Sequence, residues 1–137
     1  MKSILIDTNI AIDLVAQREP FYKEASLLFS LADESKLKLY FSSLSFANTN
    51  YILEKASSPK LAREILKKFK LIVSILDLNE KLITLAINDQ GFLDFEDGLQ
   101  YYTALENKLD LIITRNRKDF KNSRIPVMNA KEFLSIN

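Results

Sequence analysis

The sequence contains no cysteine and no histidine, and these two absences exclude several classes of chemistry. Disulfide frameworks, zinc fingers, thiolate catalysis and histidine general bases are all ruled out. Any catalysis must therefore use carboxylates, hydroxyls, amides, lysine or arginine. The chain of 137 residues also has only 2 glycines and 3 prolines. Collagen-like, low-complexity and disordered chains are richer in these residues, so a folded chain is expected.

Neither sign of charge dominates, because 19 basic residues face 18 acidic ones for a net charge of +1. No global field therefore draws the protein to nucleic acid, and a polyanionic partner would need a local basic patch. No apolar run approaches the roughly 20 residues that cross a bilayer, and Asp7 comes too early for a signal peptide. We expect one domain over residues 1–137, located in the cytoplasm and without membrane association.

Short apolar runs alternate with segments of helical periodicity. The runs that predict strands are 3–6, 37–41, 71–76, 109–114 and 125–128. The segments that predict helices begin near Pro20, after Ser42 and Ser43, at residue 60, after Asn79, near Asp94 and at Asn129, and Gly91 is expected to end the fourth of them. Strands that are apolar on both faces and alternate with helices predict an α/β fold with a mainly parallel sheet covered on both sides.

Functional groups of such sheets gather outside the carboxyl ends of the strands, so the side chains at those ends are the candidates for chemistry. Asp7 follows the first strand, and Thr114, Arg115 and Asn116 follow the fourth. Further acids surround a helix start at Asp94, Glu96 and Asp97. Carboxylate oxygens hold hard cations such as Mg²⁺ or Mn²⁺, and converging acids repel one another unless a cation neutralises them. The pattern indicates a metal site without histidine.

Each acid also has a purely structural interpretation, and both remain open. Asp94 and Asp97 are three residues apart and share a helix face, whereas Glu96 points about 100° away from Asp97. Asp94 could instead cap its helix, and Glu96 is better explained by the positive end of the helix dipole. Asp7 could form a turn with its own backbone.

Three sequence blocks together resemble the PIN-domain nucleases, and within them the compact bacterial toxins of VapC type. The first is Ile4-Leu5-Ile6-Asp7-Thr8-Asn9 followed by an apolar run. The second covers residues 94–104 (DFEDGLQYYTA) and the third covers residues 111–120 (LIITRNRKDF). With the ending at residues 125–134, the resemblance extends over nearly the whole chain.

The resemblance implies a three-layer α/β/α sandwich with a mainly parallel five-stranded sheet, and an acid cluster that binds Mg²⁺ or Mn²⁺ and cuts RNA. Asp7 matches the first acid of the family and Asp97 the third. Asn48 and Asn116 stand where the second and fourth acids are expected. An amide keeps an oxygen ligand but removes a charge, which weakens cation binding. The residues expected to compensate are Asp94 first, then Asp119, with Glu96 as a further auxiliary acid.

The implied reaction is hydrolysis of an RNA phosphodiester by metal-activated water. Thr114 and Asn116 would orient water or phosphate by hydrogen bonds. Arg115, Arg117 and Lys118 form a basic cluster that could contact RNA phosphates, although a solvated loop explains the cluster equally well.

Two competing functions are consistent with the residues. The first is a metal-dependent endoribonuclease acting as the toxin of a toxin–antitoxin pair, expected to form a homodimer and to bind a small antitoxin protein. The second is a PIN-fold module that has lost catalysis and binds RNA or protein, which Asn48 and Asn116 favour. A response-regulator-like receiver is disfavoured, because Asp7 has no neighbouring acid in its turn.

Overall fold

The computed structural model describes residues 1–136 and contains one five-stranded sheet in the order β3-β2-β1-β4-β5. Every strand pair in it is parallel, as predicted. The strands are β1 (Lys2–Ile6), β2 (Leu37–Ser42), β3 (Ser74–Leu76), β4 (Leu111–Ile113) and β5 (Val127–Met128). The central position of β1, between β2 and β4, sets the carboxyl ends of three strands side by side.

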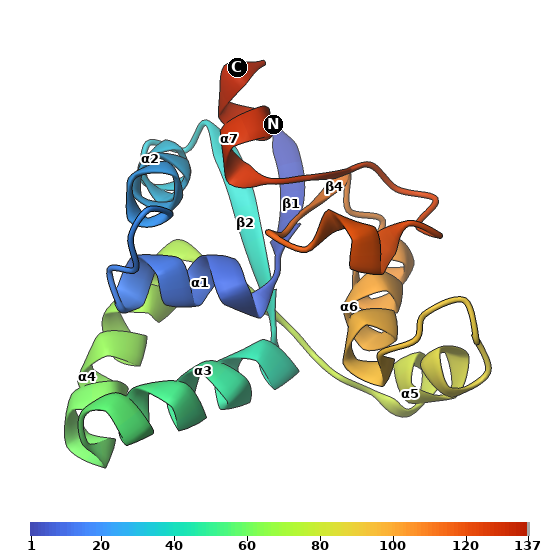
Figure 1. Ribbon diagram of the computed structural model, residues 1–137, viewed down its shortest axis with the longest axis horizontal. Coiled ribbons are helices and arrows are strands. Elements are labelled where there is room, and N and C mark those ends of the chain that lie inside the picture. The colour runs from blue at the N-terminus through green and yellow to red at the C-terminus, as the bar shows by residue number, and fades with distance from the viewer. Residues whose placement is uncertain (137) are drawn as a thin grey trace.

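Helices cover both faces of the sheet, which gives the three layers expected for this α/β chain (Figure 1). The helices are α1 (Thr8–Val15), α2 (Tyr22–Asp33), α3 (Ser43–Ala56), α4 (Pro59–Phe69), α5 (Glu80–Ile87), α6 (Phe95–Glu106) and α7 (Ala130–Ser135), with short 3-10 turns at Lys70–Ile72 and Arg117–Phe120. In Figure 1, α1 to α4 lie on one side of the strands, and α5 and α6 lie on the other. None of the helices in the described part is both long and apolar enough to cross a membrane.

Side chains alternate across the sheet and build two separate cores. Ile4 and Ile6 of β1 pack into the larger core with α2, α4 and α7, while Leu5 between them packs into the smaller core with α6. This period of two is what a strand buried on both faces requires. In the larger core the ring of Phe69 lies 5.4 Å from Phe29 and 5.3 Å from Phe41, centroid to centroid.

The structure differs from the sequence prediction in the segment after Asp7. The first helix was expected near Pro20, but α1 begins at Thr8, directly after the first strand, and α2 follows from Tyr22. Helix α1 has only 8 residues, and its N-cap Asp7 also fits a turn. For these reasons the sequence did not reveal where the helix starts. Asp7 caps it, because its carboxylate accepts a hydrogen bond from Thr8 N.

The boundaries of several further elements also differ, and the expected strands 109–114 and 125–128 are shortened to Leu111–Ile113 and Val127–Met128. Residues 71–76 were expected to form one strand, but a 3-10 turn takes Lys70–Ile72 and only Ser74–Leu76 pairs with the sheet. This strand lies at the sheet edge, where one neighbour is missing and pairing is short. Gly91 does not end the helix before it, since α5 already stops at Ile87.

Substitution of Phe69 tests the larger core. Phe69→Ala removes a ring that is 3% exposed and contacts other aromatic rings, so we expect the free energy of unfolding to fall by about 3–5 kcal/mol. Urea denaturation followed by circular dichroism measures the loss. Leu71→Ala is the control, since Leu71 is 85% exposed. Equal losses in both variants would contradict the assigned core.

Candidate functional site

Asp7 lies at the carboxyl end of β1, where the chain passes into α1. Its backbone N–H donates to Ile113 O of the neighbouring strand at 2.9 Å, which fixes the residue between the two strand ends. Its side chain is 8% exposed. Thr8 N donates to Oδ1 at 2.8 Å, and Thr114 Oγ1 donates to Oδ2 at 2.8 Å. A buried carboxylate needs such partners, and here they come from both strand ends.

Thr114 and Asn9 tie the loop after β4 to the first turn of α1. Thr114 Oγ1 accepts hydrogen bonds from Asn116 N at 3.1 Å and from Asn9 Nδ2 at 3.3 Å. Asn9 Oδ1 in turn accepts from Arg115 N at 3.2 Å. Thr114 is fully buried and thus positions Asp7. The bridging role of Asn9 was not assigned from the sequence, although its place in the first motif was the available signal.

The start of α6 brings the second group of acids to the same region. Asp94 is the N-cap of α6, and its Oδ1 accepts hydrogen bonds from Glu96 N at 2.8 Å and Asp97 N at 3.4 Å. The capping interpretation of Asp94 is thereby confirmed. Both bonds use one carboxylate oxygen, so the cap engages Asp94 through Oδ1 alone.

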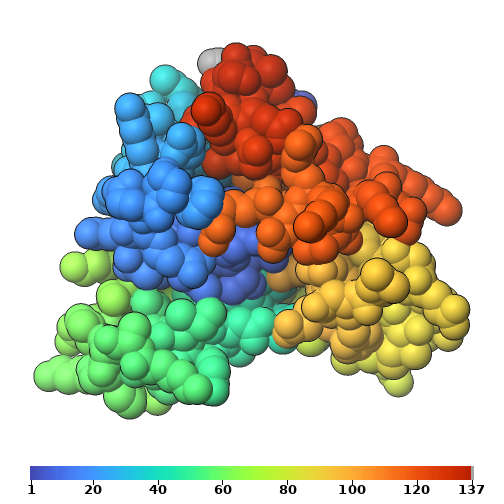
Figure 2. Space-filling view, in the orientation of Figure 1, coloured from blue at the N-terminus to red at the C-terminus, as the bar shows by residue number. Residues whose placement is uncertain are grey.

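An open pocket of about 520 Å³ collects most of the predicted site residues. We call it the acidic pocket; the predicted residues that line it are Asp7, Asn48, Asp94, Glu96, Asp97 and Asn116. In Figure 2 dark-blue atoms from the region where α1 begins show in the middle of this face, between the green α3–α4 segment and the yellow-to-orange part of the chain. Residues from α1, α3, α6 and the loop after β4 therefore meet at one place, as expected for the carboxyl ends of parallel strands.

Glu96 lines the acidic pocket together with Asp97, although the helical period placed it on a different side. The cause is a contact with α3: Asn48 Nδ2 donates a hydrogen bond to Glu96 Oε1 at 3.2 Å. The amide that stands at an expected acid position thus holds a neighbouring carboxylate at the pocket. This long-range contact could not be read from the spacing of residues 94–97.

The acids in this region raise one another's proton affinity. Burial, together with the smaller effects of the charges of Asp94, Asp7, Asp119 and Glu96, raises the pKa of Asp97 to about 7. Burial also raises the pKa of Asp7, while the hydrogen bonds from Thr114 and Thr8 act against this shift. Such mutual repulsion is what a bound cation relieves.

The donor set fits a hydrated Mg²⁺ or Mn²⁺ ion better than a cation held entirely by protein. Among residues 1–136, no three His, Cys, Asp or Glu side chains form a metal-binding group. Magnesium, however, is often bound by one or two carboxylates and keeps several waters. Gln100 adds a second observation: it is 4% exposed and lines the acidic pocket, and its Oε1 has no hydrogen-bond partner within the described chain. A buried acceptor of this kind is suited to a metal-coordinated water.

Gln100 and Ser45 were not identified from the sequence. Gln100 Nε2 donates to Ser45 Oγ at 2.6 Å, and Thr8 Oγ1 donates to the same oxygen at 2.8 Å. This buried contact joins α6, α3 and α1 beneath the pocket. A glutamine one turn after Asp97 was the only signal in the sequence, and glutamine in a helix has no specific meaning by itself.

The predicted basic cluster of Arg115, Arg117 and Lys118, and also Asp119, lie outside the acidic pocket. The Arg115 side chain turns to Asp13, with Nε 2.8 Å from Oδ2, and Arg117 Nη1 lies 3.0 Å from Glu132 Oε2. Lys118 and Asp119 belong to the 3-10 turn Arg117–Phe120. Asp119 acts on the site through its charge, which raises the pKa of Asp7 and Asp97. Of residues 115–119, Asn116 alone lines the acidic pocket.

Comparisons with known proteins agree with this architecture. The chain is 29% identical to Ribonuclease VapC1 of Aquifex aeolicus (strain VF5), over 96% of this chain and 93% of that protein. A toxin–antitoxin complex from Klebsiella pneumoniae contains a chain with a TM-score of 0.68 and 25% identity, covering 93% of this chain and 97% of that one. The Mycobacterium tuberculosis toxin VapC20, which cleaves the sarcin–ricin loop, shares the fold with a TM-score of 0.64 at 16% identity, over 80% of this chain and 86% of that one.

The family model for the PIN domain matches residues 3–118, which include most of the first strand, the acidic pocket and the beginning of the segment after β4. The model therefore covers Asp7, Asp97 and Asn116, the residues on which the resemblance of the sequence depends. The chain belongs to the PIN domain family.

Proposed function

We propose that this protein is a Mg²⁺- or Mn²⁺-dependent endoribonuclease and the toxin of a toxin–antitoxin pair. The observation that carries the proposal is the acidic pocket, in which the buried carboxylate of Asp7, held by Thr114, meets Asp97 and further acids. Similarity to a ribonuclease along nearly the full chain supports RNA as the substrate.

The residues of the pocket have distinct roles in this proposal. Asp7 and Asp97 hold the metal ion. When bound, the ion lowers the pKa of a coordinated water and offsets the negative charge of the scissile phosphate. Gln100 orients a water through its free Oε1, and Asn116 donates a hydrogen bond to a phosphate oxygen. Thr114 acts through Asp7, because it is fully buried and keeps the carboxylate in one orientation.

Three acids supply negative charge that Asn48 and Asn116 lack. Glu96 is held at the pocket by Asn48, and Asp94 lines the pocket while it caps α6. Asp119 contributes through its field, since its charge raises the pKa of Asp97. Three nearby carboxylates therefore offset the two missing charges, which supports an active site over a decayed one.

A second candidate function is an RNA- or protein-binding module without catalysis. Four carboxylates line the acidic pocket, but no three His, Cys, Asp or Glu side chains in the part of the chain described form a metal-binding group, and this observation favours the alternative. Under this alternative, Arg115, Arg117 and Lys118 would bind RNA phosphates without cleavage.

Conversion of the two central acids to amides distinguishes the two functions. Asp7→Asn and Asp97→Asn keep the side-chain shape but remove the charge that holds the metal, so we expect RNA cleavage to fall by about 100-fold or more. Cleavage of a labelled RNA pool in Mg²⁺ and in Mn²⁺ measures the loss, and thermal melting confirms the fold. Asp33→Asn is the control, because Asp33 is an exposed residue of α2. Undiminished cleavage in both site variants would remove the assigned site.

We further propose that the protein forms a homodimer in the cytoplasm and binds a small antitoxin protein. The structural relative from Klebsiella pneumoniae is a toxin–antitoxin complex, which supports a partner of this kind. Light scattering of the purified chain is expected to give twice the monomer mass across a range of concentrations. A monomer at all concentrations would contradict the dimer and leave the nuclease proposal untouched.

A further inference from the structure

A buried carboxylate next to the acidic pocket holds two arginines. Asp13 on α1 has a side chain that is 1% exposed, and each of its oxygens faces a different guanidinium group. Arg18 Nε donates to Oδ1 at 3.2 Å, and Arg115 Nε lies 2.8 Å from Oδ2 as an ion pair without aligned hydrogen-bond geometry. One negative charge against two positive charges leaves this cluster with a net charge of +1.

The loop between α1 and α2 brings Arg18 into this position. Gln17 adopts a left-handed backbone conformation with φ 50°, which turns the chain at the end of α1. Arg18 N then donates to Asp13 O at 3.1 Å, so Arg18 folds back along the helix that carries Asp13. Backbone and side chain thus hold Arg18 to the same residue, which reduces the conformational freedom of a long side chain.

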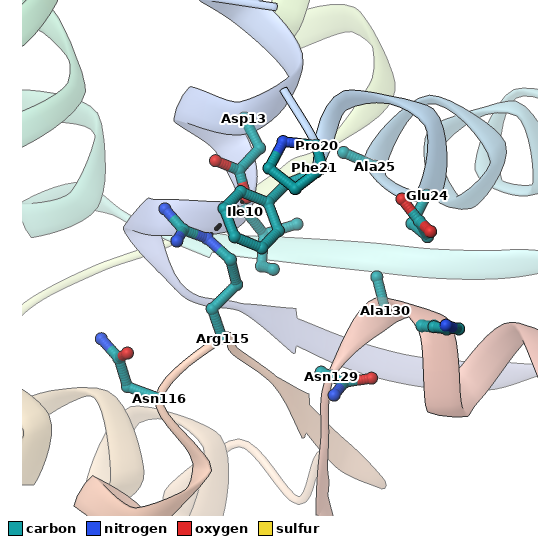
Figure 3. A pocket seen from close by; sticks show the side chains of 11 residues that line it. Ile10, Asp13, Pro20, Phe21, Glu24, Ala25, Arg115, Asn116, Asn129 and Ala130 are labelled. Atoms are coloured by element: carbon teal, nitrogen blue, oxygen red, sulfur yellow. Dashed lines mark ion pairs between the residues drawn. The ribbon is translucent and has the colours of Figure 1, made fainter. Parts of the chain in front are cut away.

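The two arginines face two neighbouring pockets. Arg18 is 44% exposed and lines the acidic pocket together with Asp7 and Asp97. Arg115 lines a second pocket of about 410 Å³, and its guanidinium carbon lies 4.0 Å from the centroid of the Phe21 ring. Figure 3 shows the Arg115 guanidinium beside the Phe21 ring, joined by a dashed line to Asp13, with Asn116 nearby. Asn116 lines both pockets, so the two pockets adjoin.

Within each guanidinium group, Nε is the atom paired with the Asp13 carboxylate. Within the described residues, no ion pair or hydrogen bond engages the Nη groups of Arg18. The other charged residues that line the acidic pocket are all acids. A guanidinium fork with free N–H groups matches two phosphate oxygens, and its rigidity lowers the entropy lost on binding. A cation at the rim of an acidic pocket also attracts the phosphate that the acids would repel.

We propose that Arg18 and Arg115, oriented by Asp13, form a phosphate clamp for the RNA strand across the two adjoining pockets. This inference rests on the proposed nuclease function and adds the element that binds the substrate backbone. Arg18 contacts a phosphate next to the one placed over Asp7 and Asp97, and Arg115 contacts the strand where it passes Asn116. Asp13 is a positioning residue, because it acts on RNA through the two arginines.

Binding of RNA without metal tests the clamp separately from catalysis. The probe is a short fluorescein-labelled single-stranded RNA of mixed sequence, titrated with protein in EDTA and followed by fluorescence anisotropy at several salt concentrations. Arg18→Gln is expected to raise the Kd about tenfold and to lower the slope of log Kd against log salt by about 0.7, the value for one phosphate contact on a single strand. The matched control is Arg63→Gln, which removes an exposed arginine on α4.

A second variant covers the case in which Arg18→Gln destabilises the fold. The double variant Asp13→Asn with Arg18→Gln converts the buried carboxylate to an amide together with the loss of one arginine. Because Arg115 then also loses its charged partner, we expect a rise in Kd and a loss of slope at least as large as in Arg18→Gln. If wild-type protein binds RNA but these variants match Arg63→Gln in Kd and slope, the clamp is wrong and the nuclease proposal stands. If wild-type protein neither binds nor cleaves RNA, the clamp and the proposed function both fail.

Discussion

The hydrogen bond from Thr114 Oγ1 to the buried carboxylate of Asp7 is the contact on which the site depends. It joins the carboxyl ends of β1 and β4, and it satisfies a charged group that burial would otherwise make costly. Asp7 also caps α1, whose N-terminal dipole favours a negative charge at that position. Asp94 uses the same device at the start of α6. Two helix N-termini therefore help to hold negative charge around one pocket.

The fold and the central acids could be predicted because their signals are local. The apolar run before Asp7 predicts a buried strand, and Asp94 three residues before Asp97 predicts a helix start. Helix α1 was missed because it is short and follows the strand without a loop. The edge strand β3 is shorter than predicted because a 3-10 turn takes the first part of its apolar run.

The contacts that shape the site between elements could not be predicted from spacing. Glu96 lies at the acidic pocket because Asn48 on another helix donates a hydrogen bond to it. Arg115 pairs with Asp13 and not with the acids that line the acidic pocket. In both cases the position of a long polar side chain is set by a hydrogen bond or an ion pair to a residue far away in the sequence. The roles of the two asparagines at expected acid positions are likewise visible only from their contacts in the fold. Asn48 supports a carboxylate, and Asn116 borders both pockets.

In the proposed function, the acidic pocket cuts RNA with the help of a divalent cation. The most direct measurement is cleavage of a mixed RNA pool by purified protein freed of any antitoxin, in Mg²⁺, in Mn²⁺ and in chelator. We expect cleavage with either metal and none in chelator, with activity restored when metal is added back. Folded protein that leaves the pool intact under all three conditions would contradict the claim, and so would cleavage that continues in chelator.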